Sequence, residues 1–188
     1  HGEDRLVEKP IDYDASQVVR DLQEAKAYKK VDADIWIQKP SFVSEPRTAY
    51  FGLVHIDELV KLHQKHGKAL YEKNIRTFLG KTTDVNISIR QTLSSNPAEF
   101  LFLNNGIAAL CQEVEAKGTN QAHKGKKKFR VRNFSIINGA QTIASAAHFM
   151  EENNGADISA ARVFFTLIKA SANDEFGKSV TRARNHQN

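Results

Sequence analysis

The chain of 188 residues has little cysteine, no long apolar run and few of the motifs that mark common classes of protein. Its single cysteine, Cys111, cannot form a disulfide within the chain, which is typical of a reducing compartment and predicts a cytoplasmic protein. Cys111 lies in an apolar strand pattern, so we expect a small buried residue. No apolar run approaches the roughly 20 residues of a membrane-spanning helix, which predicts no membrane contact.

Motifs for catalysis are also missing. No serine stands in a nucleophile elbow, and no glycine-rich loop leads into Lys-Ser or Lys-Thr. His63 and His66 lie three residues apart without a further cluster of metal ligands, so we expect no metal site. A Mg²⁺-dependent nuclease needs two carboxylates and a lysine on adjacent strands. Asp34 followed by Lys39 has the wrong spacing, which favours binding over catalysis.

The charge of the chain is mildly basic, and its distribution is uneven. Lys and Arg number 27 against 22 Asp and Glu, which gives a net charge of +5. The basic residues cluster between Lys117 and Arg132, a segment without an acidic residue. Such a cluster either contacts phosphates or forms a solvated hairpin tip. As contacts to a nucleic-acid backbone we select Lys124, Lys126, Lys127, Lys128, Arg130 and Arg132.

The hydrophobic patterns predict an α+β fold, with N-terminal helices followed by a mixed β-sheet that helices flank. Helices are expected over 16–28, 57–66, 70–80, 84–95 and 140–150, and from 173 to the end. Strands are expected over 34–38 and 49–54, and four β-rich runs cover 100–103, 107–114, 128–137 and 161–170. Because the chain begins without methionine and stops inside a helical pattern, we expect it to be a fragment of a longer protein.

Amides and a glycine interrupt two of the apolar runs. Asn104, Asn105 and Gly106 follow the run FLFL, and Asn-Gly between two β runs is typical of a hairpin turn. A hairpin accounts for Asn105 and Gly106 but leaves Asn104 as an additional amide. Asn138 and Gly139 end the other run.

The second interruption leads into a helix that has Gln141 and Thr142 in its first turn. The N–H groups at a helix start attract an anion such as phosphate, and glycine lets a ligand approach the backbone. Amide side chains donate and accept hydrogen bonds, which suits a nucleobase edge or a sugar hydroxyl. A capped helix after a tight turn is the structural alternative.

Two further clusters carry polar groups near apolar patterns. Arg184, Asn185 and Gln187 lie at the end of the last predicted helix, where they either reach phosphate and base groups or belong to a plain surface helix. Arg76 borders an apolar helical face, where it is either an anion clamp or an arginine that extends along that face to solvent.

Four motifs in order resemble the AIPR family, the abortive-infection phage-resistance proteins. They are LYEKNIRTFLGKTTDVNISIRQTL, FLFLNNGIAAL, IINGAQTIASA and VTRARNHQN. The resemblance covers residues 45–188 and predicts an AIPR-like domain there, truncated on its C-terminal side. The charged, aperiodic start and the helical spacing after it predict a linker or helical segment over 1–44. It implies a role in bacterial phage defence. Relatives often carry an N-terminal segment that resembles a restriction endonuclease, so a nuclease-like part of the same polypeptide is an expected partner.

We therefore hypothesise a module that binds or senses a nucleotide or nucleic acid in one polar pocket at the strand ends. Phosphate would lie on the helix start at Gly139, and a nucleotide with Mg²⁺ is the one cofactor suggested. The selected ligand-binding residues are Arg76, Asn104, Asn105, Gly106, Asn138, Gly139, Gln141, Thr142, Arg184, Asn185 and Gln187. One alternative is a phosphodiester-cleaving or NTP-hydrolysing enzyme, with Asp84, Glu99 or His186 as base. The other is a protein-interaction scaffold.

Overall fold

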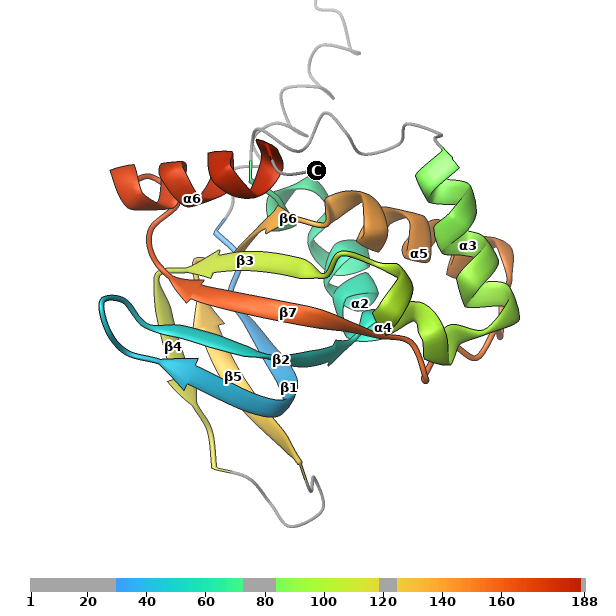
Figure 1. The fold of residues 1–188 in the computed structure, drawn as a ribbon, viewed down its shortest axis with the longest axis horizontal. Helices are drawn as coiled ribbons and strands as arrows, with labels where there is room; N and C mark the ends of the chain where they lie inside the picture. The colour runs from blue at the N-terminus through green and yellow to red at the C-terminus, as the bar shows by residue number, and fades with distance from the viewer. Residues whose placement is uncertain (1–29, 73–83, 119–124, 187–188) are drawn as a thin grey trace, which may run out of the picture.

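The structure is a computed structural model that describes residues 30–72, 84–118 and 125–186 (Figure 1). The predicted α+β class is confirmed, because helices flank a seven-stranded mixed sheet. The helix expected over 16–28 lies outside the described residues, as do residues 73–80 of the helix expected over 70–80. The strands are β1 (Ala33–Val43), β2 (Ala49–His55), β3 (Ile107–Cys111), β4 (Glu113–Ala116), β5 (Lys126–Arg132), β6 (Ser135–Asn138) and β7 (Arg162–Lys169). The α-helices are α2 (Ile56–His66), α3 (Asp84–Ser95), α4 (Phe100–Leu103), α5 (Ala140–Glu152) and α6 (Glu175–His186), with short 3₁₀ turns at η1 (Gly67–Leu70) and η3 (Pro97–Glu99).

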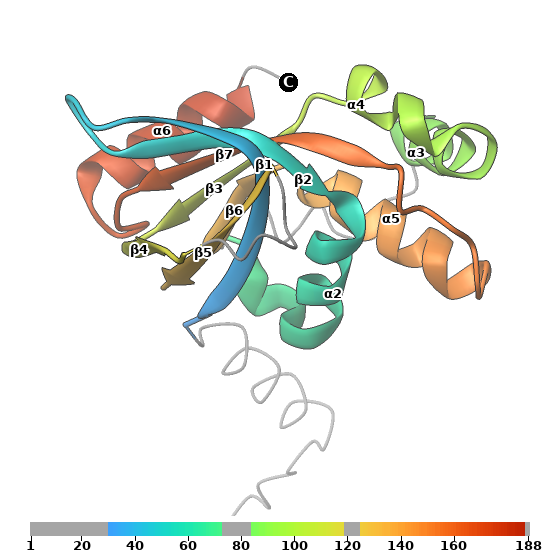
Figure 2. The ribbon, with the colours of Figure 1, turned by 90° about the horizontal axis from the view of Figure 1, so that it is seen from below.

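The sheet has the strand order β4-β5-β1-β2-β7-β3-β6 and curls strongly (Figures 1 and 2). Only β3 and β7 are parallel, and the other neighbours are antiparallel. Gln112 alone joins β3 to β4, although these strands lie near opposite edges in the strand order. Asn133 and Phe134 join β5 to β6 in the same way. Such short connections are possible only because the curled sheet brings its two ends together.

Helices cover one face of the sheet and part of the other, as the alternation along β3 shows. Ile107, Ala109 and Cys111 point into the main core, where α2 and α5 cover the concave face. Ala108 and Leu110 point to the outer face, where they pack in a smaller cluster together with apolar residues of α6. Figure 2 shows α6 and α2 on opposite sides of the sheet. A strand buried on both faces reads as a continuous apolar run, and all five residues of β3 are buried.

Cys111 is buried, as predicted from its apolar strand pattern. Burial raises the pKa of its thiol to about 12, because the charged thiolate is disfavoured away from water. The thiol is therefore protonated at neutral pH and packs as a small apolar side chain. In the described part of the chain, no helix has both the length and the apolar character needed to cross a membrane.

Three local predictions are wrong. The run FLFL forms the helix α4 instead of a strand, so Asn105 and Gly106 connect a helix to β3 and form no hairpin. The N-cap of α2 is His55, and Asp57 lies in the first turn of that helix. The β-rich runs over 107–114 and 128–137 each divide into two strands that pair with different neighbours.

Candidate functional site

Two glycine turns meet at one end of the sheet, where the N-terminal end of β3 lies beside the C-terminal end of β6. Ala108 pairs with Asn138 in the antiparallel register of these strands. Gly106 and Gly139 both have left-handed backbone conformations, with φ of 81° and 92°. A Cβ atom on Gly139 would lie 3.1 Å from the carbonyl oxygen of Gly106. The two interrupted apolar runs are thus neighbours in space, and both close approaches need glycine.

A small cavity of about 50 Å³ opens beside these turns. Residues from four segments line it, namely Asn105, Gly106, Ile107, Ala108, Asn138, Phe164, Thr166 and Arg184. Four of them were selected from the sequence: Asn105, Gly106, Asn138 and Arg184. We call this group of cavity-lining residues the amide cavity.

One hydrogen bond holds two of the segments together at the amide cavity. The side-chain N–H of Asn138 donates to the backbone carbonyl of Arg184 over 2.8 Å. This bond ties the end of α6 to the end of β6, across 46 residues of sequence. Asn105 is exposed, and within the described residues its side chain makes no hydrogen bond. Its amide is therefore available to a ligand.

The structure places the other selected residues elsewhere. Asn104 donates to the carbonyl oxygen of Phe100 over 2.9 Å, and Asn185 donates to that of Thr181 over 2.8 Å. Both amides thus bond to backbone one helical turn earlier. Gln141 and Thr142 lie half-buried in the first turn of α5, beside the amide cavity but not in its lining. Arg76, Gln187 and Lys124 lie outside the described residues.

The start of α5 presents backbone donors next to the cavity. Gly139 is its N-cap residue and contributes no side-chain cap. The amide of Ile143 donates to the carbonyl oxygen of Gly139 over 3.2 Å, which closes the first turn. The first N–H groups of any α-helix have no acceptor within the helix, and the helix dipole makes this end attractive to anions.

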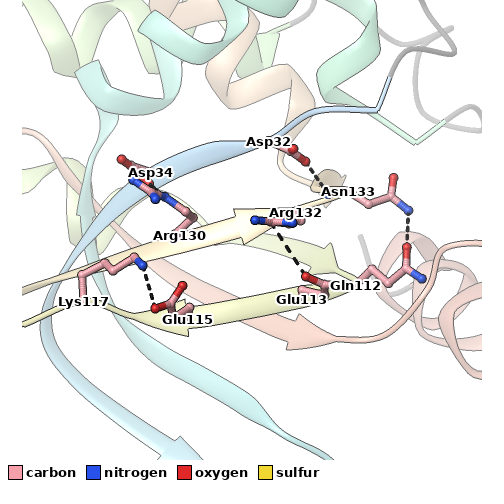
Figure 3. A network of polar contacts seen from close by, with 9 residues as sticks. All are labelled: Asp32, Asp34, Gln112, Glu113, Glu115, Lys117, Arg130, Arg132 and Asn133. Carbon is pink, nitrogen blue, oxygen red and sulfur yellow. Dashed lines mark hydrogen bonds and ion pairs between the residues drawn. The ribbon is translucent and has the colours of Figure 1, made fainter.

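The basic strand β5 is flanked by acidic side chains on both sides (Figure 3). Asp34 of β1 forms ion pairs of 3.1 Å with Lys128 and Arg130. On the other side, Glu113 of β4 lies 3.9 Å from Arg132. The hydrogen bond from Arg130, with help from Lys128, lowers the pKa of Asp34, so this carboxylate stays charged at neutral pH. Lys128, Arg130 and Arg132 thus have acidic partners and are not uncompensated cations.

A second hollow lies between α2 and β1, and the sequence patterns did not indicate it. It has a volume of about 510 Å³ and is lined by Asp34, Trp36, His55, Asp57, Glu58, Lys61, Leu62, Lys126 and Ser159. Glu58 accepts a hydrogen bond from the backbone N–H of Trp36 over 3.2 Å. Burial raises the pKa of the Glu58 carboxyl despite this bond. Asp57 and Lys61 neutralise each other at 3.1 Å on the same helix.

Sequence reasoning also missed Phe164 and Thr166 in the amide cavity. Both lie on β7, where Val163, Phe165 and Leu167 alternate into the main core. The intervening positions face outward, so an apolar Phe164 among them departs from the usual polar pattern of an outer face. That departure was the one feature of the sequence that could have indicated Phe164 as a site residue. Among the residues that the structure describes, no three His, Cys, Asp or Glu side chains are grouped as a metal site would require.

The chain was compared with known protein families. The model of the AIPR protein family matches residues 71–188, which is more than half of the chain. The matched part contains every residue of the amide cavity, whereas β1, β2 and α2 precede it. No curated protein and no solved structure matches the chain significantly.

Proposed function

Because this chain belongs to the AIPR family of abortive-infection phage-resistance proteins, we propose that it serves phage defence by binding a nucleotide or a nucleic-acid end. One observation carries the proposal. Asn105, Asn138 and Arg184 come from segments far apart in sequence and line the same cavity. Amides that donate and accept, next to a helix start and an arginine, suit the polar edge of a base together with its phosphate.

The size of the cavity limits how such a ligand would bind. Cavities that enclose a small molecule measure roughly 300–1,000 Å³, far more than the 50 Å³ of the amide cavity. A whole nucleotide therefore does not fit inside it. The ligand would lie on the surface, with one polar group in the cavity and its phosphate toward the start of α5. This arrangement favours a terminal or otherwise accessible nucleotide.

The two alternative functions fare differently. An enzyme would need a general base near the amides, but within the described residues Asp84, Glu99 and His186 are not among those lining the cavity. A protein-interaction scaffold is supported by Asn104 and Asn185, which bond only to neighbouring backbone. The bond between Asn138 and Arg184 and the cavity beside it favour binding instead.

The adjacent amides Asn104 and Asn105 offer a matched pair of variants for a thermal-shift assay. Nucleoside triphosphates, short DNA and short RNA are each added at about 100 times their dissociation constant, where a bound ligand stabilises the fold by about 2.7 kcal/mol. We expect Asn105→Ala to weaken binding about 3- to 10-fold, because one hydrogen bond is lost at an exposed site. Its melting temperature without ligand should not change.

Asn104→Ala should give the opposite pattern. Loss of the bond to Phe100 is expected to lower the melting temperature of the free protein, whereas the shift caused by ligand persists. If no ligand in the panel stabilises the protein, the proposal is contradicted and the scaffold alternative is supported. Equal binding by wild type and Asn105→Ala would remove Asn105 from the site.

If the ligand is a polymer, its backbone would follow β5, and Asp34→Asn tests this. The substitution removes the acidic partner of Lys128 and Arg130, so both become available to phosphates. We expect tighter binding of single-stranded nucleic acid at low salt. The slope of log K against log[salt] should steepen by about 0.7 for each new phosphate contact. Fluorescence anisotropy at four salt concentrations measures both.

Glu151→Gln is the control for Asp34→Asn, because it makes the same change of net charge on α5, away from the β5 face. If both variants bind equally, the effect is one of total charge. Unchanged binding by Asp34→Asn would mean that the ligand does not contact β5.

A further inference from the structure

Phe164 is an exposed aromatic side chain that lines the amide cavity. Its strand, β7, lies between β2 and β3, so Phe164 is not on an edge strand of the sheet. Its exposed fraction is 59%, whereas Ile168, two positions further along the same outer face, is buried under α6. Isolated exposed apolar side chains are common on proteins. This one differs because it lines the same cavity as two amides and an arginine.

The neighbouring strands leave the ring of Phe164 accessible. On the β3 side stands Gly106, where any Cβ atom would lie 3.2 Å from the Cβ atom of Phe164. A larger residue at position 106 would therefore crowd the aromatic side chain. On the β2 side, Leu53 pairs with Phe164, and Phe51 pairs with Thr166. Phe51 is thus a diagonal neighbour of Phe164, within about 7–8 Å, and is itself 39% exposed.

The positive charge beside this aromatic surface comes from α6. Arg182 and Arg184 are exposed on that helix, which covers the adjoining part of the outer face. Arg182 makes no ion pair within the described residues, and Arg184 lines the cavity itself. An apolar protein partner would not need the amides and arginines. An aromatic platform with amides at its edge and cations nearby matches a base, its polar edge and its phosphate.

We propose that Phe164 is a stacking platform for an unpaired nucleobase, with Asn105 and Asn138 at the base edge and the phosphate between the start of α5 and the arginines at the adjoining end of α6. This inference rests on the proposed function and gives it a ligand class, a nucleobase that carries a phosphate and is free of a complementary strand. Both a nucleotide and single-stranded nucleic acid have this chemistry. Phe51 would receive the next base of a strand.

The test uses single-stranded DNA that contains 2-aminopurine, whose fluorescence falls when the base stacks. Wild type is expected to bind and to quench this fluorescence. Phe164→Leu retains an apolar side chain but loses the ring, so we expect binding about 5- to 150-fold weaker and loss of the quench. Phe164→Trp should restore both. Phe102→Leu is the matched control, because Phe102 is 79% exposed and lies outside the cavity.

Two further ligands, ATP and an abasic oligonucleotide of the same length, separate the stacking inference from the proposed function. If wild type binds the abasic strand more weakly, stacking is supported. If ATP binds and its binding requires Phe164, a single nucleotide is sufficient as the ligand. If wild type binds both oligonucleotides equally and Phe164→Leu binds as wild type does, stacking is overturned while the proposed function stands. If neither ATP nor any oligonucleotide binds, both are overturned. Melting temperatures of all variants confirm that they are folded.

Discussion

Gly177→Ala is expected to lower the free energy of unfolding by about 3 kcal/mol, at the upper end for an overpacking substitution. Alanine is the better helix former, so at an exposed helical position the same change would stabilise the protein by about 0.5–1 kcal/mol. Gly177 lies in the first turns of α6 and is buried. A Cβ atom there would lie 2.0 Å from the carbonyl oxygen of Ser171. Packing at this site therefore turns the expected gain in stability into a loss.

The loop before α6 cannot move aside without further loss. The carboxylate of Asp174 accepts the N–H of Gly177 over 2.6 Å and the N–H of Ser171 over 3.2 Å, which holds loop and helix together. Relief of the clash must break these bonds or shift α6 along the sheet. Since the far end of α6 carries the carbonyl oxygen that Asn138 binds, such a shift would also disturb the amide cavity. We expect weaker ligand binding along with the loss of stability.

Urea denaturation with two spectroscopic probes measures the effect of Gly177→Ala. Ser179→Ala serves as the control, because Ser179 is exposed two residues later in the same helix, and its change should stay within about 0.5 kcal/mol. A Gly177→Ala protein that is as stable as wild type, or more so, would mean that α6 does not pack as described.

The turn at Asn138-Gly139 could be predicted from the sequence because its cause is local, whereas the hairpin expected at Asn105-Gly106 was wrong. The pair Asn138-Gly139 was expected to end a strand and begin a helix, and β6 and α5 have these bounds. Gly106 and Gly139 both need positive φ, which favours glycine in any context. That the two turns lie side by side follows from the pairing of β3 with β6, which no short window of sequence reveals.

The helix α4 shows why a short apolar run misleads. Four consecutive apolar residues fit a strand that is buried on both faces as well as a buried helical turn. In the structure Phe100 and Leu101 are buried, whereas Phe102 and Leu103 are exposed. A strand would alternate between its faces, so this split identifies one side of a helix. The distinction depends on what α4 packs against, which is information from outside the run.

The acidic partners of β5 were hidden by their distance in sequence. Arg130 bonds to Asp34, which lies 96 residues earlier. A segment without acidic residues therefore looked unpaired, although the sheet places β1 and β4 on either side of it. The curl of the sheet was equally inaccessible, although Gln112 and Asn133 lie in the short connections where its two ends meet. Their side chains share a hydrogen bond of 3.1 Å across the two connections.

Gly52→Ala is the second large expected effect, again a loss of about 3 kcal/mol in the free energy of unfolding. A Cβ atom on Gly52 would lie 2.3 Å from Cγ2 of Ile37 and 2.6 Å from the carbonyl oxygen of Gln38. The register of β1 against β2 shifts between Gln38 and Ser41, and Lys39 within this irregularity has a positive φ of 46°. Here β1 bends over β2, and a glycine in a strand often marks such a close approach.

Two comparisons separate this steric cost from other causes. Gly155→Ala adds a Cβ atom where nothing lies within 4 Å, but at a φ of +89°, so its cost of about 1–2 kcal/mol is conformational alone. In the double variant with Ile37→Ala, the contact with Cγ2 disappears. The two losses should therefore sum to less than their separate values, as measured by urea denaturation. Additive losses would mean that β1 and β2 separate at Gly52 without strain, and that the close approach of these strands is not what bends the sheet.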